Sequence, residues 1–493
     1  MERVWYREDR AVVEAALRQG ERPDLATPLG AGVLDELLAL HEELGVLGAV
    51  GEVAVTRQRA GVGDEPLLRT LAALPFLPEG SLSGATEVLF REPALLLRLG
   101  WSPVEIRAGS NGRHRHPDGR QQESLPCHPD TLRDMLRRVP AEEWAALQQR
   151  GVRALYERGL VRGGVYAIDG SGIGPDLRLV SLVCVSAERP VVVAWRLLEG
   201  AASEKGREAS VTRALIEQTL AVGGPDCIRL LLADALYADG PLLAWLKYAT
   251  GIDALVRLPA DRQLYAEAQV AVALDGQGWT RHRYTRTIQG HKALRTVEAA
   301  AAGELRLWES FVTAATSHGV ADPTLWVGFL RDVTPDAPPT DPPPTATPAT
   351  DPAEPEPPLA LVSTRPWPSG FAAYQAYRPR WHIENDQFRE LKEGWDLERQ
   401  RWGRDPAVAL ARLTLTCLAF NTAQLYRTRH GATLADRAIR RLRRSTRAAL
   451  GPAPAVIYLH GCYAVFPLEE LLAILGHPPR DSLRPRPARP ATR

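Results

Sequence analysis

The spacing of hydrophobic positions predicts a helical first third of the chain. Within residues 1–160, apolar residues recur three and four positions apart in five segments, a pattern typical of amphipathic α-helices. The segments are AVVEAALRQ, AGVLDELLALHEELG, EPLLRTLAAL, HPDTLRDMLRRV and AEEWAALQQRGVRALYERG. The polar and basic run at residues 107–120 is expected to be an exposed loop. We therefore expect a helical N-terminal domain over residues 1–160.

The pattern changes at Gly164. Three apolar runs rich in β-branched residues, VYAID, LRLVSLVCVS and PVVVAWRLLEG, predict three successive antiparallel strands. A helix (EASVTRALIEQTLAV), a strand (CIRLLLAD), a helix (GPLLAWLKYATG) and a strand (DALVRL) follow. The order β-β-β-α-β-α-β is that of an RNase H-like core, in which the later strands add in parallel. We predict an α/β fold whose RNase H-like core begins at residues 161–258.

Residues 259–365 lose the helical pattern and predict a β-rich insertion into that core. RHRYTRTIQG, ALRTVEAAAA, LRLWESFVTA, TLWVGFLRDV and LALVST are predicted to be strands. Residues 334–358 are too rich in Pro to pack and are expected to form a disordered loop. The rest of the catalytic core is expected over residues 366–430, where DPAVALARLTLTCLAFNTAQLYR predicts a buried helix.

Charge and cysteine usage narrow the class of protein. The chain of 493 residues has a net charge of +1, but residues 376–493 carry 21 Lys and Arg against 11 Asp and Glu. This basic excess, which includes a basic C-terminal region over residues 431–493, favours a polyanionic partner such as nucleic acid. The five Cys form no CxxC pair, which fits a reducing cytosol. No apolar run of 18 residues and no signal peptide are evident, so we expect no membrane association.

One stretch, residues 377–402, carries an unusual acid. Hydrophobic residues recur at helical spacing there, and Glu384 falls in the same stripe. A buried carboxylate must be paired, neutralised or bound to a metal. Tyr377 and Arg380 lie at spacings that place them on the same face, and the long side chain of Lys392 can reach back. Two interpretations stay open: a metal-holding acid flanked by phosphate-binding side chains, or a core helix with one Arg380–Glu384 ion pair.

Three carboxylates stand out by their positions in the predicted fold. Asp169 ends the strand VYAID, Asp234 ends the strand CIRLLLAD, and Glu384 lies on the late helix. If that helix packs across the sheet, the three side chains converge. Three carboxylates suit two Mg²⁺ ions about 4 Å apart, which activate the attacking oxygen and stabilise the leaving oxygen of a phosphodiester. The alternative is that the strand-end Asp residues only cap turns.

The chain resembles the DDE transposases of bacterial insertion sequences, of the insertion-sequence family four type with a β-strand insertion. The resemblance covers roughly residues 160–430 and rests on IDGS, ADALYADG and YRPRWHIENDQFRELK. The late signature of that family is Tyr, two residues, Arg, three residues, Glu, six residues, Lys. Here the Lys comes after seven residues. The matching positions are Asp169, Asp234, Tyr377, Arg380, Glu384 and Lys392.

The resemblance implies cut-and-paste chemistry on DNA. A homodimer would bind the terminal inverted repeats, nick one strand with water, and join the freed 3′-hydroxyl to target DNA. Two Mg²⁺ ions, with Mn²⁺ able to substitute, would be held by Asp169, Asp234 and Glu384. The phosphates near the scissile bond would be held by Tyr377, Arg380 and Lys392. Residues 1–160 would recognise the DNA end or dimerise, and the protein would act in the bacterial cytoplasm at the nucleoid.

Other interpretations stay open at this point. An RNase H-like nuclease would cut without joining, and a transposase-derived protein would bind DNA without catalysis. A third alternative is that the chain is encoded by a decayed copy of the element. Trp381 is assigned to core packing in preference to stacking on a terminal base.

Overall fold

The computed structural model describes residues 6–28, 33–56, 61–77, 80–87, 89–108, 126–173, 176–200, 208–275, 278–288, 291–333, 357–399, 405–430 and 455–476. The chain divides into two compact units. One is formed by Met1–Leu155 with Arg389–Arg493, and the other by Tyr156–Phe388. Most of the predicted loop at 107–120, the Pro-rich segment at 334–358 except its last two residues, and the tail after residue 476 lie outside the described residues.

The unit Tyr156–Phe388 is built on a nine-stranded mixed sheet in the order β5-β4-β3-β6-β7-β11-β10-β9-β8. The three strands predicted to be antiparallel pair as expected. β6 pairs in parallel with β3, and β7 pairs in parallel with β6. The remaining pairs are antiparallel. The strands are β3 (Gly164–Gly172), β4 (Leu177–Cys184), β5 (Val191–Glu199), β6 (Ile228–Ala233), β7 (Asp253–Leu258), β8 (Thr280–Ile288), β9 (His291–Leu305), β10 (Leu325–Asp332) and β11 (Leu359–Ser363).

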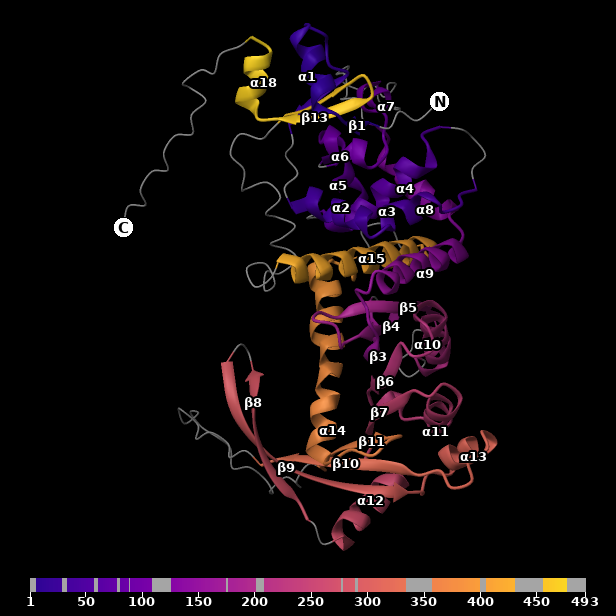
Figure 1. Ribbon diagram of the computed structural model, residues 1–493. Helices are drawn as coiled ribbons and strands as arrows, with labels where there is room; N and C mark the ends of the chain where they lie inside the picture. The colour runs from indigo at the N-terminus through magenta and orange to yellow at the C-terminus, as the bar shows by residue number, and fades with distance from the viewer. Residues whose placement is uncertain are drawn as a thin grey trace, which may run out of the picture. The chain divides into compact units, whose positions relative to one another are not determined.

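Helices cover both faces of this sheet. α10 and α11 lie on one face, and α14 and the turns that follow it run across the other face (Figure 1). The order of strands and helices therefore makes this an α/β unit, as predicted. The helices are α10 (Ala209–Gly223), α11 (Gly240–Ala244) with the π-helix η5 (Trp245–Ala249), α12 (Gln263–Leu274), α13 (Glu309–Ser317) and α14 (Gly370–Tyr377).

Two of these helices correct the expectation that residues 259–365 lose the helical pattern. α12 covers QLYAEAQVAVAL, whose Ala, Gln and Leu residues have high helix propensity. α13 lies in the segment LRLWESFVTA, which was predicted to be a strand. Its alternation of Leu and Trp with polar residues looks like a strand, but Phe311 and Ala315, four residues apart, are the buried positions. The helical spacing decides the structure here.

The stretch after Tyr377 is not one regular α-helix, which corrects the second expectation. α14 is followed by the 3-10 helix η6 (Arg378–Arg380) and the π-helix η7 (Ile383–Phe388). Pro379 has no N–H to donate, so the regular hydrogen-bond ladder is interrupted there. The π-turns place more residues in each turn than the spacing rule assumes. As a result Trp381 is only half-buried and Glu384 has a half-exposed side chain (47%).

The unit formed by Met1–Leu155 and Arg389–Arg493 is mainly helical. All five predicted helical segments are present, together with shorter helices between them. The helices are α1 (Arg10–Arg18), α2 (Val33–Glu43), α3 (Val46–Gly51), α4 (Asp64–Ala73), α5 (Leu82–Glu87), α6 (Pro93–Arg98), α7 (Pro103–Ala108), α8 (Pro129–Arg138), α9 (Ala141–Glu157) and α15 (Pro406–His430), with η1 (Leu74–Phe76), η2 (Leu89–Arg91) and the π-helix η8 (Glu390–Gly394).

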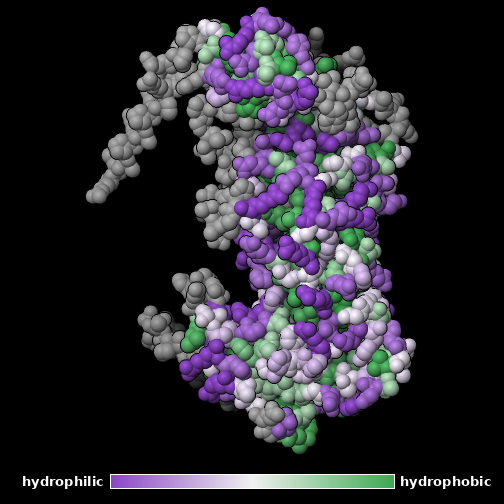
Figure 2. All heavy atoms as spheres, viewed as in Figure 1, coloured by the Kyte–Doolittle hydropathy of each residue, from purple (hydrophilic) through white to green (hydrophobic). Residues whose placement is uncertain are grey.

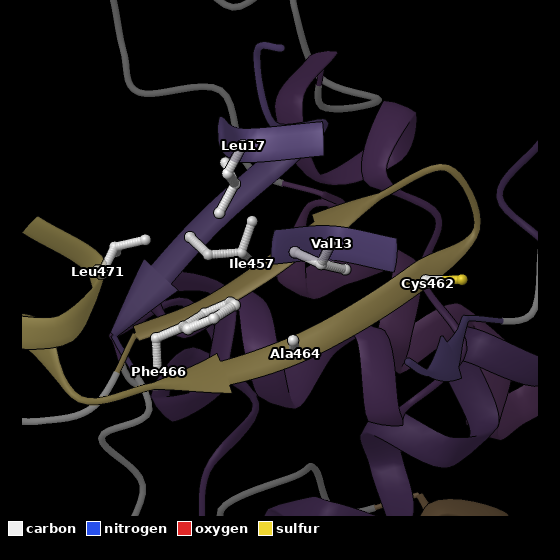
Figure 3. Close-up of a cluster of buried hydrophobic side chains, with 7 residues drawn as sticks. All are labelled: Val13, Leu17, Ile457, Cys462, Ala464, Phe466 and Leu471. Atoms are coloured by element: carbon white, nitrogen blue, oxygen red, sulfur yellow. The ribbon is translucent and has the colours of Figure 1, made fainter. Parts of the chain in front are cut away.

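Residues near both ends of the chain form a small four-stranded sheet that the sequence pattern did not reveal. The order is β1-β13-β12-β2, with β1 (Arg7–Glu8), β2 (Leu25–Pro28), β12 (Ala455–Leu459) and β13 (Cys462–Phe466). Side chains of α1 point toward those of β12, β13 and α18 (Leu468–Ile474) and form a buried cluster (Figure 3). Val13, Ala464 and Phe466 are fully buried in it.

α15 is the buried helix predicted from DPAVALARLTLTCLAFNTAQLYR. Asp405 caps it, because its Oδ1 accepts the N–H of Ala407 at 3.0 Å. By length and composition alone Pro406–Arg429 could cross a membrane, but 89% of its apolar window is buried inside the protein. α15 therefore has the burial of a core helix. On the face of the molecule drawn in Figure 2, hydrophilic residues are interspersed with small hydrophobic groups.

Candidate active site

Two of the predicted acids lie at the same edge of the sheet because their strands are parallel neighbours. Ile168 of β3 pairs with Ala233 of β6, so Asp169 and Asp234 follow at adjacent positions. Asp169 is buried (7% exposed), and its Oδ1 accepts the N–H of Gly170 at 2.8 Å. Asp234 is half-buried, and its Oδ1 accepts the N–H of Leu236 at 2.9 Å. These contacts to nearby N–H groups fix the orientation of both carboxylates.

Arg380 brings the third acid to this edge. Its Nη1 atom donates to Oδ2 of Asp169 at 3.2 Å and to Oε1 of Glu384 at 2.9 Å. The Arg380–Glu384 ion pair is the i,i+4 contact that the sequence predicted, but the same guanidinium also reaches Asp169. One nitrogen atom shared by two acids requires those acids to be close together.

The electrostatics of the cluster favour binding of positive charge. Burial, and then the nearby charge of Asp234, raise the pKa of Asp169 to about 7. Burial also raises the pKa of Asp234, although the N–H of Leu236 and the charge of Arg380 oppose that change. Carboxylates that are desolvated and close together ionise less readily, and a cation between them removes that penalty.

The donor set fits a divalent cation in its chemistry, because Mg²⁺ and Mn²⁺ prefer carboxylate oxygens. Within the described part of the chain, however, no three His, Cys, Asp or Glu side chains already form a metal cage. The Arg380 guanidinium bridges Asp169 and Glu384 instead. The side chain of Glu384 is half-exposed (47%), so it can rotate toward the two Asp residues without disturbing the core. Asp169, Asp234 and Glu384 are thus the residues that could hold a metal.

Tyr377 supports the site through the backbone. Its buried hydroxyl donates to the carbonyl oxygen of Ala233 at 3.0 Å, directly before Asp234. Burial raises the pKa of Tyr377, so the hydroxyl is a proton donor over the ordinary pH range. Its predicted contact with a DNA phosphate stays a prediction.

Lys392 lies on the π-helix η8, which belongs to the other compact unit. Its Nζ atom is 3.2 Å from Oε1 of Glu398. The structure does not place Lys392 relative to the three acids, and its predicted role also stays a prediction.

Two features of the site were not predicted from the sequence. Glu208, at the start of α10, is fully buried (1% exposed side chain) and pairs with Nη1 of Arg178 at 2.8 Å. It packs so closely on Gly170 that a Cβ there would lie 2.4 Å from its Cγ. A Glu at a helix start is usually a solvated charge that favours the helix dipole, so its sequence position gives no sign of burial.

The second unpredicted feature anchors the turn that carries Glu384. Gln387 of η7 donates from Nε2 to Oγ of Ser181 at 2.9 Å, and Oγ of Ser181 is 3.1 Å from Oε1 of Gln387. Both side chains are fully buried (0% exposed). This paired contact ties η7 to the middle of β4.

Comparison with known families gives one match. Residues 200–422 match the family described as Transposase DDE domain. The matched region contains Asp234 and Glu384 and begins after Asp169. No curated protein matches the chain. The match supports a DDE transposase, a class of enzyme that acts on DNA and whose DDE domains generally use divalent metal ions.

Proposed function

We propose, from the match to the transposase DDE domain, that this chain moves an insertion sequence by cut-and-paste transposition. It would hydrolyse a phosphodiester at each end of the element and join the freed 3′-hydroxyl to target DNA. The observation that carries the proposal is that Arg380 contacts both Asp169 and Glu384, while the pairing of β3 with β6 places Asp234 beside Asp169. A role in capping turns would not explain why Asp169 shares a buried guanidinium with Glu384, a residue 215 positions later in the sequence.

In this proposal the three acids hold two Mg²⁺ ions, with Mn²⁺ able to substitute. When bound, such ions supply an activated attacking oxygen and stabilise the leaving oxygen. Asp169 and Asp234 are already oriented by backbone N–H groups, while Glu384 would complete the ligand set by rotation. Arg380, released from Glu384, would turn its planar donors to the phosphate.

The wider assignments are part of the same proposal. The strand order of the Tyr156–Phe388 unit, three antiparallel strands followed by two parallel ones, supports an RNase H-like core that carries a β-rich insertion. Tyr377 and Lys392 would assist phosphate binding, and the N-terminal helices would recognise the inverted repeats or the partner in a homodimer. The protein would act on the bacterial nucleoid, in the cytoplasm.

The test uses the full chain and a supercoiled plasmid that carries its coding region with the flanking DNA. With Mg²⁺, we expect nicks at the two ends of the element and joined strand-transfer products. Glu384→Gln should abolish both, whereas Glu393→Gln, the same change at an exposed neighbouring acid, should not. Nicks without joined products would support the nuclease. Equal nicking by Glu384→Gln and the parent would overturn the assignment of the third acid.

A further inference from the structure

The edge strand β8 presents two chemically different faces. Successive side chains of a strand alternate in direction, so Arg281 and Arg283 point one way and His282, Tyr284 and Arg286 point the other. The second face lies against α14: the His282 ring stacks on Phe371 with centroids 4.3 Å apart. In addition, the hydroxyl of Tyr284 is 3.1 Å from that of Tyr374. Aromatic contacts thus hold β8 beside the helix that leads to Arg380.

Two arginines on this side rest on aromatic rings. The Cζ atom of Arg286 lies 5.3 Å from the ring centre of Trp381, and that of Arg378 lies 5.4 Å from the ring centre of Tyr284. Among the described residues neither arginine has a carboxylate partner, and Arg378 donates only to the amide oxygen of Gln375 at 3.1 Å. A guanidinium that lies over a ring uses its flat face, which leaves its in-plane N–H donors available.

Three other arginines, on β8, β9 and β10, are paired with acids. Arg281 and Arg331 both bind Glu298, each at 2.7 Å. Arg295 lies 3.5 Å from Asp332. Arg331 also lies over a ring, with its Cζ atom 4.3 Å from the ring centre of Trp279, but it has an acid partner as well. Arg286 and Arg378 differ from these arginines because they combine a ring contact with no carboxylate partner among the described residues.

This charge adjoins the candidate active site. Trp381 directly follows Arg380, whose guanidinium binds Asp169 and Glu384. A DNA strand with its scissile phosphate at those acids carries further phosphates along its backbone. Planar guanidinium groups held still by rings bind phosphate with little loss of side-chain entropy.

We propose that Tyr284, Arg286, Arg378 and Trp381, here named the Arg–aromatic face, bind backbone phosphates of the DNA strand next to the scissile bond. The inference rests on the proposed function and adds a phosphate-binding surface to it. Arg286 and Arg378 make the phosphate contacts. Tyr284 and Trp381 are positioning residues that hold the two guanidinium groups in place.

The test measures the affinity of the full chain for a short fluorescein-labelled duplex at a series of salt concentrations. Each phosphate contact that is lost lowers the slope of log K against log salt by about 0.9. Arg286→Gln and Arg378→Gln should each lower it by about that amount, and the double variant by about twice as much. Arg281→Gln is the matched control, because Glu298 keeps its second partner Arg331 and the slope should not change.

Arg286→Lys distinguishes the loss of positive charge at this position from an effect of the substitution on folding. It keeps the positive charge, so the parent slope should be retained. An unchanged slope in both Gln variants would overturn the inference, as would an equal fall in Arg281→Gln or in Arg286→Lys. The plasmid assay decides the proposed function separately. Nicking with unchanged slopes rejects only the Arg–aromatic face, whereas lowered slopes without any Mg²⁺-dependent nicking keep the face and reject the transposase.

Discussion

Arg380 and Asp169 are 211 positions apart in the sequence, and Nη1 of Arg380 donates to Oδ2 of Asp169 at 3.2 Å. Both side chains are buried, with 8% and 10% of their surface exposed. The same nitrogen binds Glu384. A single buried guanidinium therefore holds two acids of the candidate site in one place, and the chain from Tyr377 to Glu384 is arranged around this contact.

Replacement of Arg380 should destabilise the protein in a pH-dependent way. Arg380→Gln removes a charged donor from two acids and should lower the free energy of unfolding by about 1–3 kcal/mol. The pKa of Asp169 is raised to about 7, above its unfolded value, so its ionisation destabilises the folded state as the pH rises toward 7. Arg380 stabilises the ionised form of Asp169, which is present well above pH 7 and absent well below it. The loss of stability in Arg380→Gln should therefore be larger well above pH 7 than well below it. Urea unfolding with EDTA present measures both; a loss independent of pH would contradict the account.

The hydroxyl of Tyr377 gives a second prediction. Tyr377→Phe removes the donor to the carbonyl of Ala233 and should lower the free energy of unfolding by about 1 kcal/mol. Tyr248→Phe is the control, because that hydroxyl has no hydrogen-bond partner among the described residues. Chemical denaturation compares the two. If Tyr377 only positions the strand end, the salt dependence of DNA binding stays unchanged; a lower slope would instead support the predicted phosphate contact.

Gly170 should not tolerate a side chain, whereas Gly172 on the same strand should. A Cβ at Gly170 would lie 2.4 Å from Cγ of Glu208, while a Cβ at Gly172 would meet nothing within 4 Å. Overpacking of this kind costs about 1–3 kcal/mol. We expect Gly170→Ala to lower the midpoint of thermal unfolding and Gly172→Ala to leave it near the parent value. Equal midpoints for the two variants would show that Glu208 does not pack on Gly170.

The fully buried His41 of α2 predicts an acid-sensitive step in the unfolding of its own unit. Burial lowers its pKa from 6.5 to about 3, and its Nδ1 is 2.7 Å from Oγ1 of Thr422. Between those two pKa values the unfolded chain binds one more proton, so stability is complete above pH 6.5 and falls as the pH decreases. The slope from one such group is about 1.4 kcal/mol per pH unit.

His41→Gln removes the titrating group and should reduce the pH slope by that amount. Urea unfolding over the acidic range, followed by tryptophan fluorescence, measures it. His318→Gln, a change at an exposed histidine, should keep the parent slope. Identical slopes for the parent and His41→Gln would mean that His41 is protonated in the folded protein.

The positions of the two Asp residues on neighbouring strands could be predicted because local sequence determines those strands. Long apolar runs rich in β-branched residues make β3 and β6, and Asp234 directly follows the end of β6 as predicted. The prediction that Asp169 ends its strand was wrong, because β3 continues through Gly170 and Ser171 to Gly172, which pair with β4. Parallel pairing then places Asp169 beside Asp234. The buried helix after Asp405 was equally evident, because it is apolar nearly all round and has both a capping Asp and a following Pro.

The rest of the site depends on contacts that spacing cannot reveal. The 3.6-residue rule placed Glu384 on a buried face, but Pro379 and the π-turn η7 rotate it to a half-exposed position. Only tertiary packing shows that Arg380 also reaches Asp169. The burial of Glu208 could not be predicted for the same reason, since Glu208 lies at the start of α10 and its partner Arg178 lies on β4. The sheet made by β1, β2, β12 and β13 was missed because its strands are short and come from both ends of the chain.

The central claim is that Asp169, Asp234 and Glu384 together hold divalent cations, and binding of Mn²⁺ tests it most directly. The free-ion signal in electron paramagnetic resonance measures how much Mn²⁺ the full chain binds. The parent should bind Mn²⁺ in competition with Mg²⁺, each single Asn or Gln variant should bind it more weakly, and the triple variant should lose that binding while Glu393→Gln keeps it. Equal Mn²⁺ binding by the parent and the triple variant would contradict the account.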